Sequence, residues 1–220
     1  MSNIKFFEHS TVKNPKHLVI FLHGYGANGE NLLDLSHEFA HVIPDANYIS
    51  PNAIEPWEGG FPNAYQWFSL ANWGSNSDIS KVAQSVKNAN KILGTFIQGH
   101  LDRFQLKPEK LFLIGFSQGA MMSLYQGLSM QEKPAGIISY SGKLILPEHL
   151  GEITVSKPDI CLVHGKLDSV LPFTNFLEAE KLLQQNKIPF ESHAFEHLDH
   201  TIDIQGIRAG MHFVKKLLEK

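Results

Sequence analysis

The sequence predicts a single α/β domain with a mostly parallel central sheet and helices on both faces. Short apolar segments rich in β-branched and aromatic residues alternate with segments whose apolar residues recur every three or four positions. This alternation is typical of parallel sheets, because a helix crosses back over the sheet between successive parallel strands. No repeat, low-complexity tract or long linker interrupts residues 1–220, so we expect one domain.

The composition fits a globular protein and argues against several classes of partner. Apolar residues make up 43% of the 220 residues, which is enough for one sizeable core. The formal net charge is -3, whereas nucleic-acid binders usually carry a basic excess, so nucleic acid is not an expected partner. Cys161 is the only cysteine, which excludes an internal disulfide and fits a reducing compartment. With no signal peptide and no apolar run of about 20 residues, we expect a cytoplasmic protein without integral membrane association.

The first half of the chain predicts two strands, one helix and a long irregular stretch. Residues 17–23 form a short, apolar, β-rich run that predicts a buried strand. Residues 28–42 predict a helix that ends before Pro44, and residues 47–50 predict a short strand. Residues 51–77 are rich in proline, glycine, asparagine and aromatic residues and show no clear period. An irregular stretch of this length inside a compact domain is usually functional, so we expect this loop to lie near an active site.

The second half predicts a regular alternation of helices and strands. From residue 78 onward, apolar residues at helical spacing predict an amphipathic helix capped by Ser77 or Asp78. Further strands are expected at 110–115, 135–140, 159–164 and 190–195, and further helices at 117–130, 172–186 and 204–220. Chemistry in such sheets gathers at the carboxyl ends of the strands.

A candidate nucleophile lies between a predicted strand and a predicted helix. Residues 115–119 match the pattern G-x-S-x-G, in which the serine occupies a tight turn and projects its hydroxyl above the sheet. The flanking glycines let neighbouring backbone pass close by, and the start of the next helix favours a developing oxyanion. The motif therefore predicts Ser117 as a nucleophile. The plain structural alternative is a glycine-bounded turn with a capping serine.

The chain also supplies a candidate acid and base in the required order. A serine hydroxyl needs a base to take its proton, and the base needs an orienting carboxylate. With a serine on this kind of turn, the chain order is Ser, then Asp or Glu, then His. Asp168 and His200 each follow a predicted strand and fill these two roles. We prefer His200 to His197 because it lies deeper in its loop, directly before the last helix. The adjacent Asp199 is less suited to orient His200, since neighbouring side chains in an extended loop point apart.

Two backbone N–H groups are candidates for an oxyanion hole. One donor in such sites comes from the residue after the nucleophile, here Gln118. The other comes from a glycine-rich loop after an early strand, where Tyr25 lies between two glycines. His23 precedes this loop, and we interpret it as a bracing residue rather than a base.

At this point the chain resembles the small carboxylesterase and acyl-protein thioesterase family of α/β-hydrolases, also called the phospholipase/carboxylesterase family. The matching strings, in order along most of the chain, are Phe21-Leu22-His23-Gly24-Tyr25-Gly26, Gln66-Trp67-Phe68, Gly115-Phe116-Ser117-Gln118-Gly119-Ala120, His164-Gly165 with Asp168 and Pro172, and His200. The resemblance implies a triad of Ser117, Asp168 and His200, main-chain oxyanion donors at Tyr25 and Gln118, and no cofactor or metal. It also implies a single α/β-hydrolase domain.

The chain departs from the family pattern at two positions near the expected site. Tyr25 stands where an aliphatic residue is common, which could narrow or polarise the acyl pocket. Leu198 occupies a place often taken by glycine before the histidine. Neither change removes a catalytic atom, since the oxyanion donor at position 25 is backbone.

Aromatic residues in the irregular stretch suggest an apolar substrate. We expect contacts to an acyl chain from Trp67, Phe68, Leu70, Trp73 and Val170. The alternative for each ring is that it packs the loop onto the core. The expected reaction is hydrolysis of a carboxylic ester or thioester through an acyl-enzyme on Ser117. The substrate is a small or lipid-like ester, a lysophospholipid or an acylated protein, and a homodimer is possible.

A zinc peptidase is one competing hypothesis. The motif H-E-x-x-H occurs in the chain as His37-Glu38-Phe39-Ala40-His41. Two histidines four residues apart share one helix face and can hold zinc, with the glutamate as base. The metzincin continuation of the motif is absent, and the chain contains 12 histidines, which makes chance matches more frequent.

A non-catalytic binding module on the same fold is the other competing hypothesis, since a fold does not fix a function. Every catalytic position is filled, and this favours an enzyme.

Overall fold

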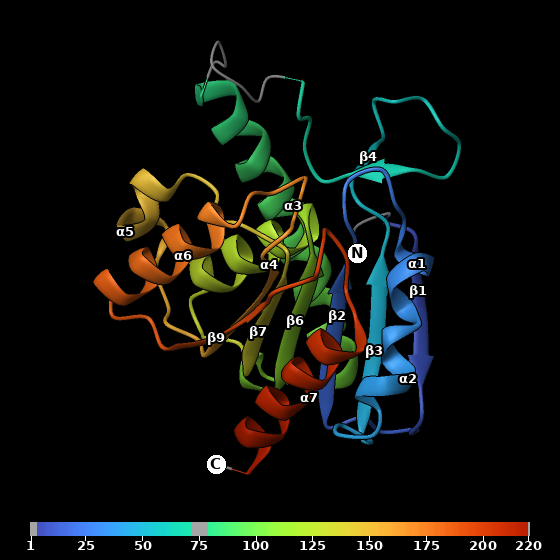
Figure 1. Cartoon of the computed structure of the whole chain (residues 1–220). Coiled ribbons are helices and arrows are strands. Elements are labelled where there is room, and N and C mark those ends of the chain that lie inside the picture. Colours follow the sequence, from blue (N-terminus) through green and yellow to red (C-terminus); the bar gives the residue numbers. More distant parts are fainter. Residues whose placement is uncertain (1–3, 72–78, 220) are drawn as a thin grey trace.

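The computed structural model describes residues 4–71 and 79–219. Its seven-stranded sheet has the strand order β1-β3-β2-β6-β7-β8-β9 (Figure 1). Strand β1 runs antiparallel to β3, and the other neighbours are parallel. The elements in chain order are β1 Phe6–Ser10, β2 His17–Leu22, α1 Gly29–Leu33, α2 Leu35–Phe39, β3 Ala46–Pro51, β4 Glu55–Pro56, β5 Tyr65–Gln66, α3 Ile79–Phe104, β6 Leu111–Phe116, α4 Gln118–Ser129, β7 Gly136–Tyr140, α5 Leu150–Ile153, β8 Ile160–Gly165, α6 Thr174–Gln185, β9 Phe190–Phe195 and α7 Ile204–Leu218.

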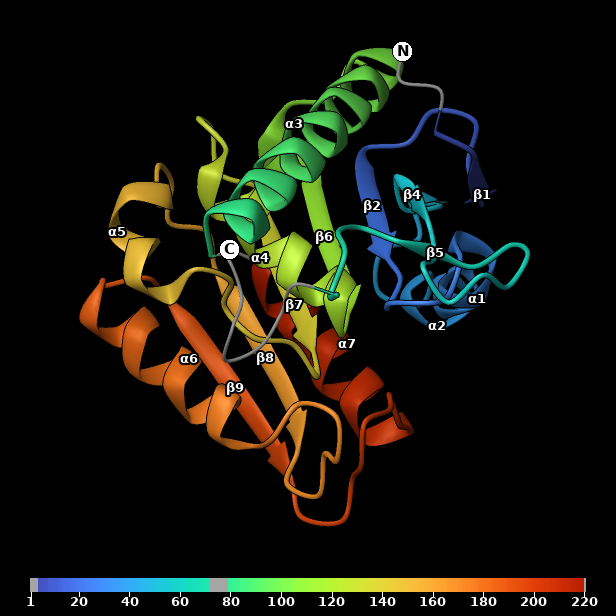
Figure 2. The same cartoon turned by 90° about the horizontal axis from the view of Figure 1, so that it is seen from above.

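Strand β2 shows why the sheet is covered on both faces. Its residues are buried almost without exception, and alternate side chains enter two different apolar clusters. Leu18, Ile20 and Leu22 pack with residues of α3, α4 and α6. Val19 and Phe21 pack with residues of α1, α2 and α7. A strand buried on both faces reads as a continuous apolar run, and Figure 2 shows the two helical layers that bury it.

The predicted fold class is confirmed, and the long elements lie within one or two residues of their predicted bounds. The prediction of a single helix over residues 28–42 is wrong. The chain forms two short helices that meet at Asp34, whose N–H bonds to the Leu32 carbonyl instead of continuing the α-helical ladder. Leu32 and Leu33 before the break and Leu35 after it all pack against the same apolar cluster.

Several short elements were not predicted from the sequence. Strand β1 lies at the sheet edge with alternate residues exposed, so it lacks the apolar run that marked the other strands. The irregular stretch contains a small antiparallel hairpin of β4 and β5, and the short helix α5 follows β7. The expected caps Ser77 and Asp78 and the expected contact residue Trp73 lie outside the described residues.

Within residues 4–71 and 79–219, no helix combines the length and apolar character needed to cross a bilayer.

At the turn between β6 and α4, two glycines let backbone segments pass very close to one another. A Cβ built on Gly119 would lie 1.9 Å from the Leu22 carbonyl oxygen, and one on Gly115 would lie 2.3 Å from the Gly119 carbonyl oxygen. Only glycine fits at both positions, because real Cβ atoms do not approach backbone oxygen this closely. The first turn of α4 is thereby held against the end of β2.

We expect Gly119→Ala to lower the free energy of unfolding by roughly 3 kcal/mol, because the backbone of β2 or α4 must move to admit the methyl group. For a chain of this length, that loss lowers the melting temperature by about 6–12 °C, measured by thermal unfolding. Gly151→Ala is the matched control, since the nearest atom to its Cβ is 3.8 Å away. A Gly119→Ala protein as stable as the control would contradict this account of the turn.

Candidate active site

Ser117 lies at the carboxyl end of β6, in a strained backbone conformation. Its φ of 53° and ψ of -117° are unfavourable for a residue with a Cβ, at a cost of about 1–3 kcal/mol. Two backbone bonds hold the turn: the Ser117 N–H donates to the Tyr140 carbonyl at 2.9 Å, and the Met121 N–H donates to the Ser117 carbonyl at 3.1 Å. The predicted strand-turn-helix arrangement is confirmed, with the serine between β6 and α4.

The three predicted catalytic side chains form one hydrogen-bonded series. His200 Nε2 lies 2.9 Å from Ser117 Oγ, and His200 Nδ1 lies 2.8 Å from Asp168 Oδ2. The three residues come from separate loops, 83 and 32 positions apart along the chain. This geometry lets the serine hydroxyl donate to Nε2 while Nδ1–H donates to the carboxylate, which fixes the imidazole tautomer.

The Asp168 carboxylate is fully buried and has a partner for each oxygen. Oδ1 accepts from the backbone N–H groups of Val170 and Leu171 at 3.0 and 2.7 Å. Oδ2 faces His200 and, at 3.3 Å, His164 Nε2, whose proton is also shared with the Leu171 carbonyl. Burial lowers the pKa of His164, against the opposing effects of that carbonyl and of the Asp168 charge. A neutral His164 braces the loop without competing with His200 as a second cation.

Asp199 forms hydrogen bonds that link the loop carrying Asp168 to the loop carrying His200. Its Oδ1 accepts from the backbone N–H and the hydroxyl of Ser169, both at 2.9 Å, and from the His200 N–H at 2.7 Å. Asp199, a rival acid in the sequence, thus has a supporting role that the sequence did not predict. No local pattern could have revealed it, because Ser169 is 30 residues away. The rival base His197 is exposed.

The glycine-rich loop after β2 passes directly beside the nucleophile. A Cβ built on Gly24 would lie 3.4 Å from the Ser117 Cβ. The Gly26 N–H donates to the Tyr65 carbonyl at 2.9 Å, which anchors the far side of the loop. Among the described residues, the N–H groups of Tyr25 and Gln118 have no hydrogen-bond acceptor. Both N–H groups are therefore unpaired within the described chain, so their role as oxyanion donors stays a prediction.

His23 braces this loop and is not a base. Its Nδ1–H donates to the Gly24 carbonyl at 2.8 Å, and its Nε2 accepts from the Ala53 N–H at 2.9 Å. Burial lowers the pKa of His23 to about 4, although the bond to Gly24 opposes this. The imidazole is neutral with both nitrogens occupied, which confirms the interpretation made from the sequence.

The side chain of Gln118 explains why Gln66-Trp67-Phe68 accompanies the nucleophile motif. Its Oε1 accepts from the Trp67 N–H at 2.9 Å and its Nε2 donates to the Phe68 carbonyl at 2.7 Å. The Trp67 indole N–H donates to the His23 carbonyl at 2.9 Å. The Gln118 side chain thus holds the backbone of Trp67 and Phe68 against the core.

The predicted acyl contacts differ in how accessible they are. Trp67 and Phe68 are fully buried, so an acyl chain could reach them only if the surrounding segment moved. Leu70 is half-buried against the core, and Val170 is 60% exposed. Of the described candidates, Val170 offers the most open apolar surface.

The zinc-peptidase motif extends past the end of the short helix α2, which ends at Phe39, so His41 lies outside it. Among the described residues, neither His37 nor His41 belongs to a group of three side chains that could hold a metal ion. Within the described chain, the one group of three possible metal ligands is Cys161, Glu191 and His193. Burial raises the pKa of the Cys161 thiol well above its usual range, which disfavours the thiolate that a metal would bind.

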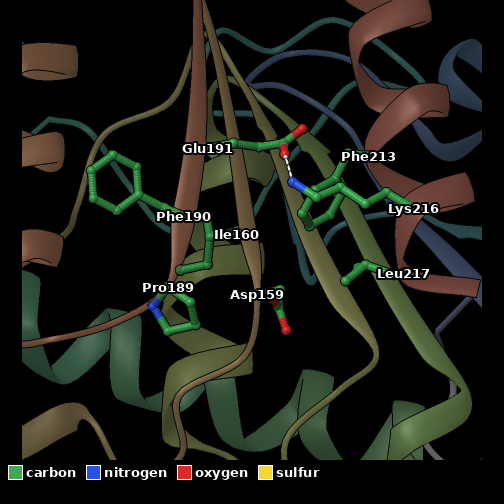
Figure 3. Close-up of a pocket in the computed structure, with 8 residues that line it drawn as sticks. All are labelled: Asp159, Ile160, Pro189, Phe190, Glu191, Phe213, Lys216 and Leu217. Carbon is green, nitrogen blue, oxygen red and sulfur yellow. Dashed lines mark hydrogen bonds and ion pairs between the residues drawn. The ribbon is translucent and has the colours of Figure 1, made fainter. Parts of the chain in front are cut away.

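Glu191, one of these three residues, is already paired with a lysine side chain. It forms an ion pair with Lys216 at 3.0 Å across a cavity of about 90 Å³ (Figure 3). Asp159 and Pro189, which precede β8 and β9, line the same cavity. It therefore lies at the amino ends of these strands, away from the carboxyl edge where Ser117 lies.

A serine on a strained strand-to-helix turn, joined through histidine to a buried aspartate, defines a serine hydrolase of the α/β-hydrolase fold. A sequence profile of the phospholipase/carboxylesterase family matches residues 6–218. The chain therefore belongs to the phospholipase/carboxylesterase family, as the resemblance had indicated.

Individual relatives agree with this family. Acyl-protein thioesterase 1 of Kluyveromyces lactis is 26% identical over 225 residues, covering 96% of each chain. Esterase YpfH of Escherichia coli is 26% identical over 226 residues, covering 100% of this chain and 91% of the esterase. The crystal structure of esterase PE8 is similar with a TM-score of 0.90 and 31% identity, covering 97% of this chain and 99% of that chain.

We expect Asp199→Ala to lower the melting temperature at neutral pH, because three donors lose their acceptor. Bonds from the Ser169 and His200 N–H groups, and then from the Ser169 hydroxyl, lower the pKa of Asp199. The Asp199 carboxylate thus stabilises the folded protein fully at a pH above its pKa in the unfolded chain. This stabilisation is lost as the pH falls through the lower pKa that Asp199 has in the folded protein. The melting-temperature difference between wild type and Asp199→Ala should shrink below about pH 4.

Asp34→Ala is the matched control, since this exposed aspartate makes no side-chain cap bond. A difference between wild type and Asp199→Ala that is constant from pH 7 to pH 3 would show that charge on Asp199 does not hold the two loops together.

Proposed function

We propose that the protein is a serine carboxylesterase that hydrolyses carboxylic esters or thioesters with an apolar acyl group through an acyl-enzyme on Ser117. The observation that carries this proposal is the series from Asp168 through His200 to Ser117, with spacings of 2.8 and 2.9 Å. Membership of a family of hydrolases supports the same class of reaction.

Acylation begins with proton transfer. His200 Nε2 accepts the Ser117 hydroxyl proton as Oγ attacks the carbonyl carbon of the substrate. The Asp168 carboxylate supports the imidazolium through Nδ1–H and keeps the ring in the orientation that faces Oγ. When the tetrahedral intermediate collapses, the imidazolium gives its proton to the departing alcohol or thiol, and the acyl group stays on Ser117.

Deacylation repeats these steps with water in place of the serine hydroxyl. His200 takes a proton from water, the resulting oxygen nucleophile attacks the acyl-enzyme, and the proton returns to Ser117 Oγ. In both halves the negative charge develops on the former carbonyl oxygen. The backbone N–H groups of Tyr25 and Gln118 are our candidates to bind it, since both lack another acceptor among the described residues.

Apolar surface around the acid supports an apolar acyl group. Leu167 and Val170 flank Asp168 and are 59% and 60% exposed. Large exposed apolar side chains beside a catalytic edge favour a hydrocarbon chain over a charged substrate. Leu70, in the irregular stretch of residues 51–77, remains a candidate contact for the acyl chain.

Three narrower substrate classes are candidates for the same triad. Relatives in yeasts and in Escherichia coli are named acyl-protein thioesterase 1 and esterase YpfH, which supports an acylated protein or a small ester as substrate. Lysophospholipid is the third candidate, and we expect the enzyme to act in the cytoplasm. A homodimer stays a prediction.

We expect Ser117→Ala to reduce kcat/KM for a p-nitrophenyl butyrate substrate by about 10⁴-fold or more, because the acyl-enzyme cannot form. His200→Ala should have a similarly severe effect, since no other described side chain contacts Ser117 Oγ as a base. The matched control is His197→Ala, which removes an exposed imidazole from the same loop and should keep nearly full activity. Circular dichroism verifies that each variant is folded.

An active His200→Ala with an inactive His197→Ala would overturn the choice of base. A fully active Ser117→Ala would overturn the proposed mechanism. Comparing p-nitrophenyl butyrate with an S-acylated protein and with a lysophospholipid then separates the three candidate substrate classes.

A further inference from the structure

The Glu58 carboxylate collects three hydrogen bonds from two separate segments. Its Oε1 accepts from the Tyr25 hydroxyl and from the Leu70 N–H, the latter at 3.2 Å. Its Oε2 accepts from the Ser69 hydroxyl at 2.5 Å. Glu58 itself is held in the β4–β5 hairpin by its own N–H, which donates to Gln66 Oε1 at 2.9 Å. The hairpin projects beyond the carboxyl edge of the sheet (Figure 1).

We propose that Glu58 is a positioning residue for the oxyanion hole, and that it acts through the Tyr25 hydroxyl. This inference rests on the proposed function, in which the Tyr25 N–H is one of the two oxyanion donors. Glu58 touches no reacting atom in this proposal. It fixes the residue that carries the donor.

The backbone around Tyr25 needs such a support. Tyr25 lies between Gly24 and Gly26, and Gly26 has a φ of 76°, so both neighbours are residues with unusual conformational freedom. The loop is fixed on its far side by the bond from Gly26 to the Tyr65 carbonyl, but the Tyr25 N–H must stay unpaired to serve an oxyanion. The side chain is the remaining place where residue 25 can be held directly.

Tyrosine suits this purpose better than the aliphatic residue common at this position. Its ring packs edge-on against Trp57 at 5.9 Å between centroids, and its hydroxyl adds a directional bond that an aliphatic chain lacks. Burial, followed by the hydrogen bond and charge of Glu58, raises the pKa of Tyr25 to about 12, so the hydroxyl remains a donor. Burial opposes ionisation of Glu58, but the bonds from Ser69, Tyr25 and Leu70 lower its pKa, so it remains an acceptor.

The same carboxylate connects the two oxyanion donors. Ser69 and Leu70, which it binds, directly follow Trp67 and Phe68. Those two residues bond through their backbone to the side chain of Gln118, which carries the second donor. Hydrogen bonds and the covalent backbone of residues 67–70 therefore form one path from residue 25 to residue 118, and Glu58 joins its two parts.

The test is a double-mutant cycle on Tyr25→Phe, Glu58→Ala and the double variant, with kcat and KM measured on p-nitrophenyl butyrate. Each single variant should lower kcat roughly tenfold with KM within twofold, because a displaced donor weakens the transition state more than substrate binding. The double variant should be no slower than the slower single variant, since each single variant already removes the bond between the Tyr25 hydroxyl and Glu58. Glu58→Gln, which keeps one acceptor oxygen, should recover part of the rate.

A control variant and a choice of temperature separate an effect on the oxyanion hole from a loss of folded protein. Glu109→Ala removes a glutamate before β6, at the opposite end of the sheet, and should leave kcat unchanged. All rates are taken well below each melting temperature, so a loss of folded protein does not enter kcat.

Each outcome decides the inference. A tenfold, non-additive loss confined to kcat supports it. The inference would be overturned by wild-type kcat in Tyr25→Phe and Glu58→Ala, by additive losses of kcat, or by losses confined to KM. The proposed function would still hold in these cases, provided that the wild type hydrolyses the ester and Ser117→Ala does not. A wild-type protein without turnover would overturn both.

Discussion

The close approach of α4 to the end of β2 is the constraint on which the site depends. Gly119 lies so near the Leu22 carbonyl that no side chain fits between them. This contact brings together the strained turn at Ser117, the glycine-rich loop that follows β2, and the first N–H groups of α4. The nucleophile and its candidate oxyanion donors therefore share one edge of the sheet, where the backbone of α4 lies directly against the end of β2.

At the triad, the buried Asp168 carboxylate faces the imidazole that also reaches the Ser117 hydroxyl. The buried Asp168 has its oxygens occupied by backbone N–H groups and by His200, which is how a buried carboxylate is tolerated. Burial lowers the pKa of two further histidines, His23 and His164, and each donates a ring N–H to a backbone carbonyl. His200 is left as the imidazole that faces both a carboxylate and the Ser117 hydroxyl, so base chemistry is directed to one place.

Sequence reasoning worked where the physical signal was local or continuous. Long buried strands appear as apolar runs, and the G-x-S-x-G turn with its flanking strand and helix is a local pattern, so the fold class and Ser117 could be predicted. It failed where the deciding contacts are distant in sequence. The link from Asp199 to Ser169 and the one from Gln118 to Trp67 span 30 and 51 residues, and neither leaves a pattern in its own segment. Half-exposed elements such as β1 failed for a different reason, because they bury too little apolar surface to form a run.

The most direct test of the central claim is covalent labelling of the folded protein with a fluorophosphonate probe, followed by mass spectrometry of the modified peptides. The account predicts a single adduct on Ser117 that is lost when the protein is unfolded before labelling and that forms far more slowly in His200→Ala. An adduct on another residue, or a folded protein that does not react, would contradict the account, because the hydrogen-bonded series would then not activate this serine.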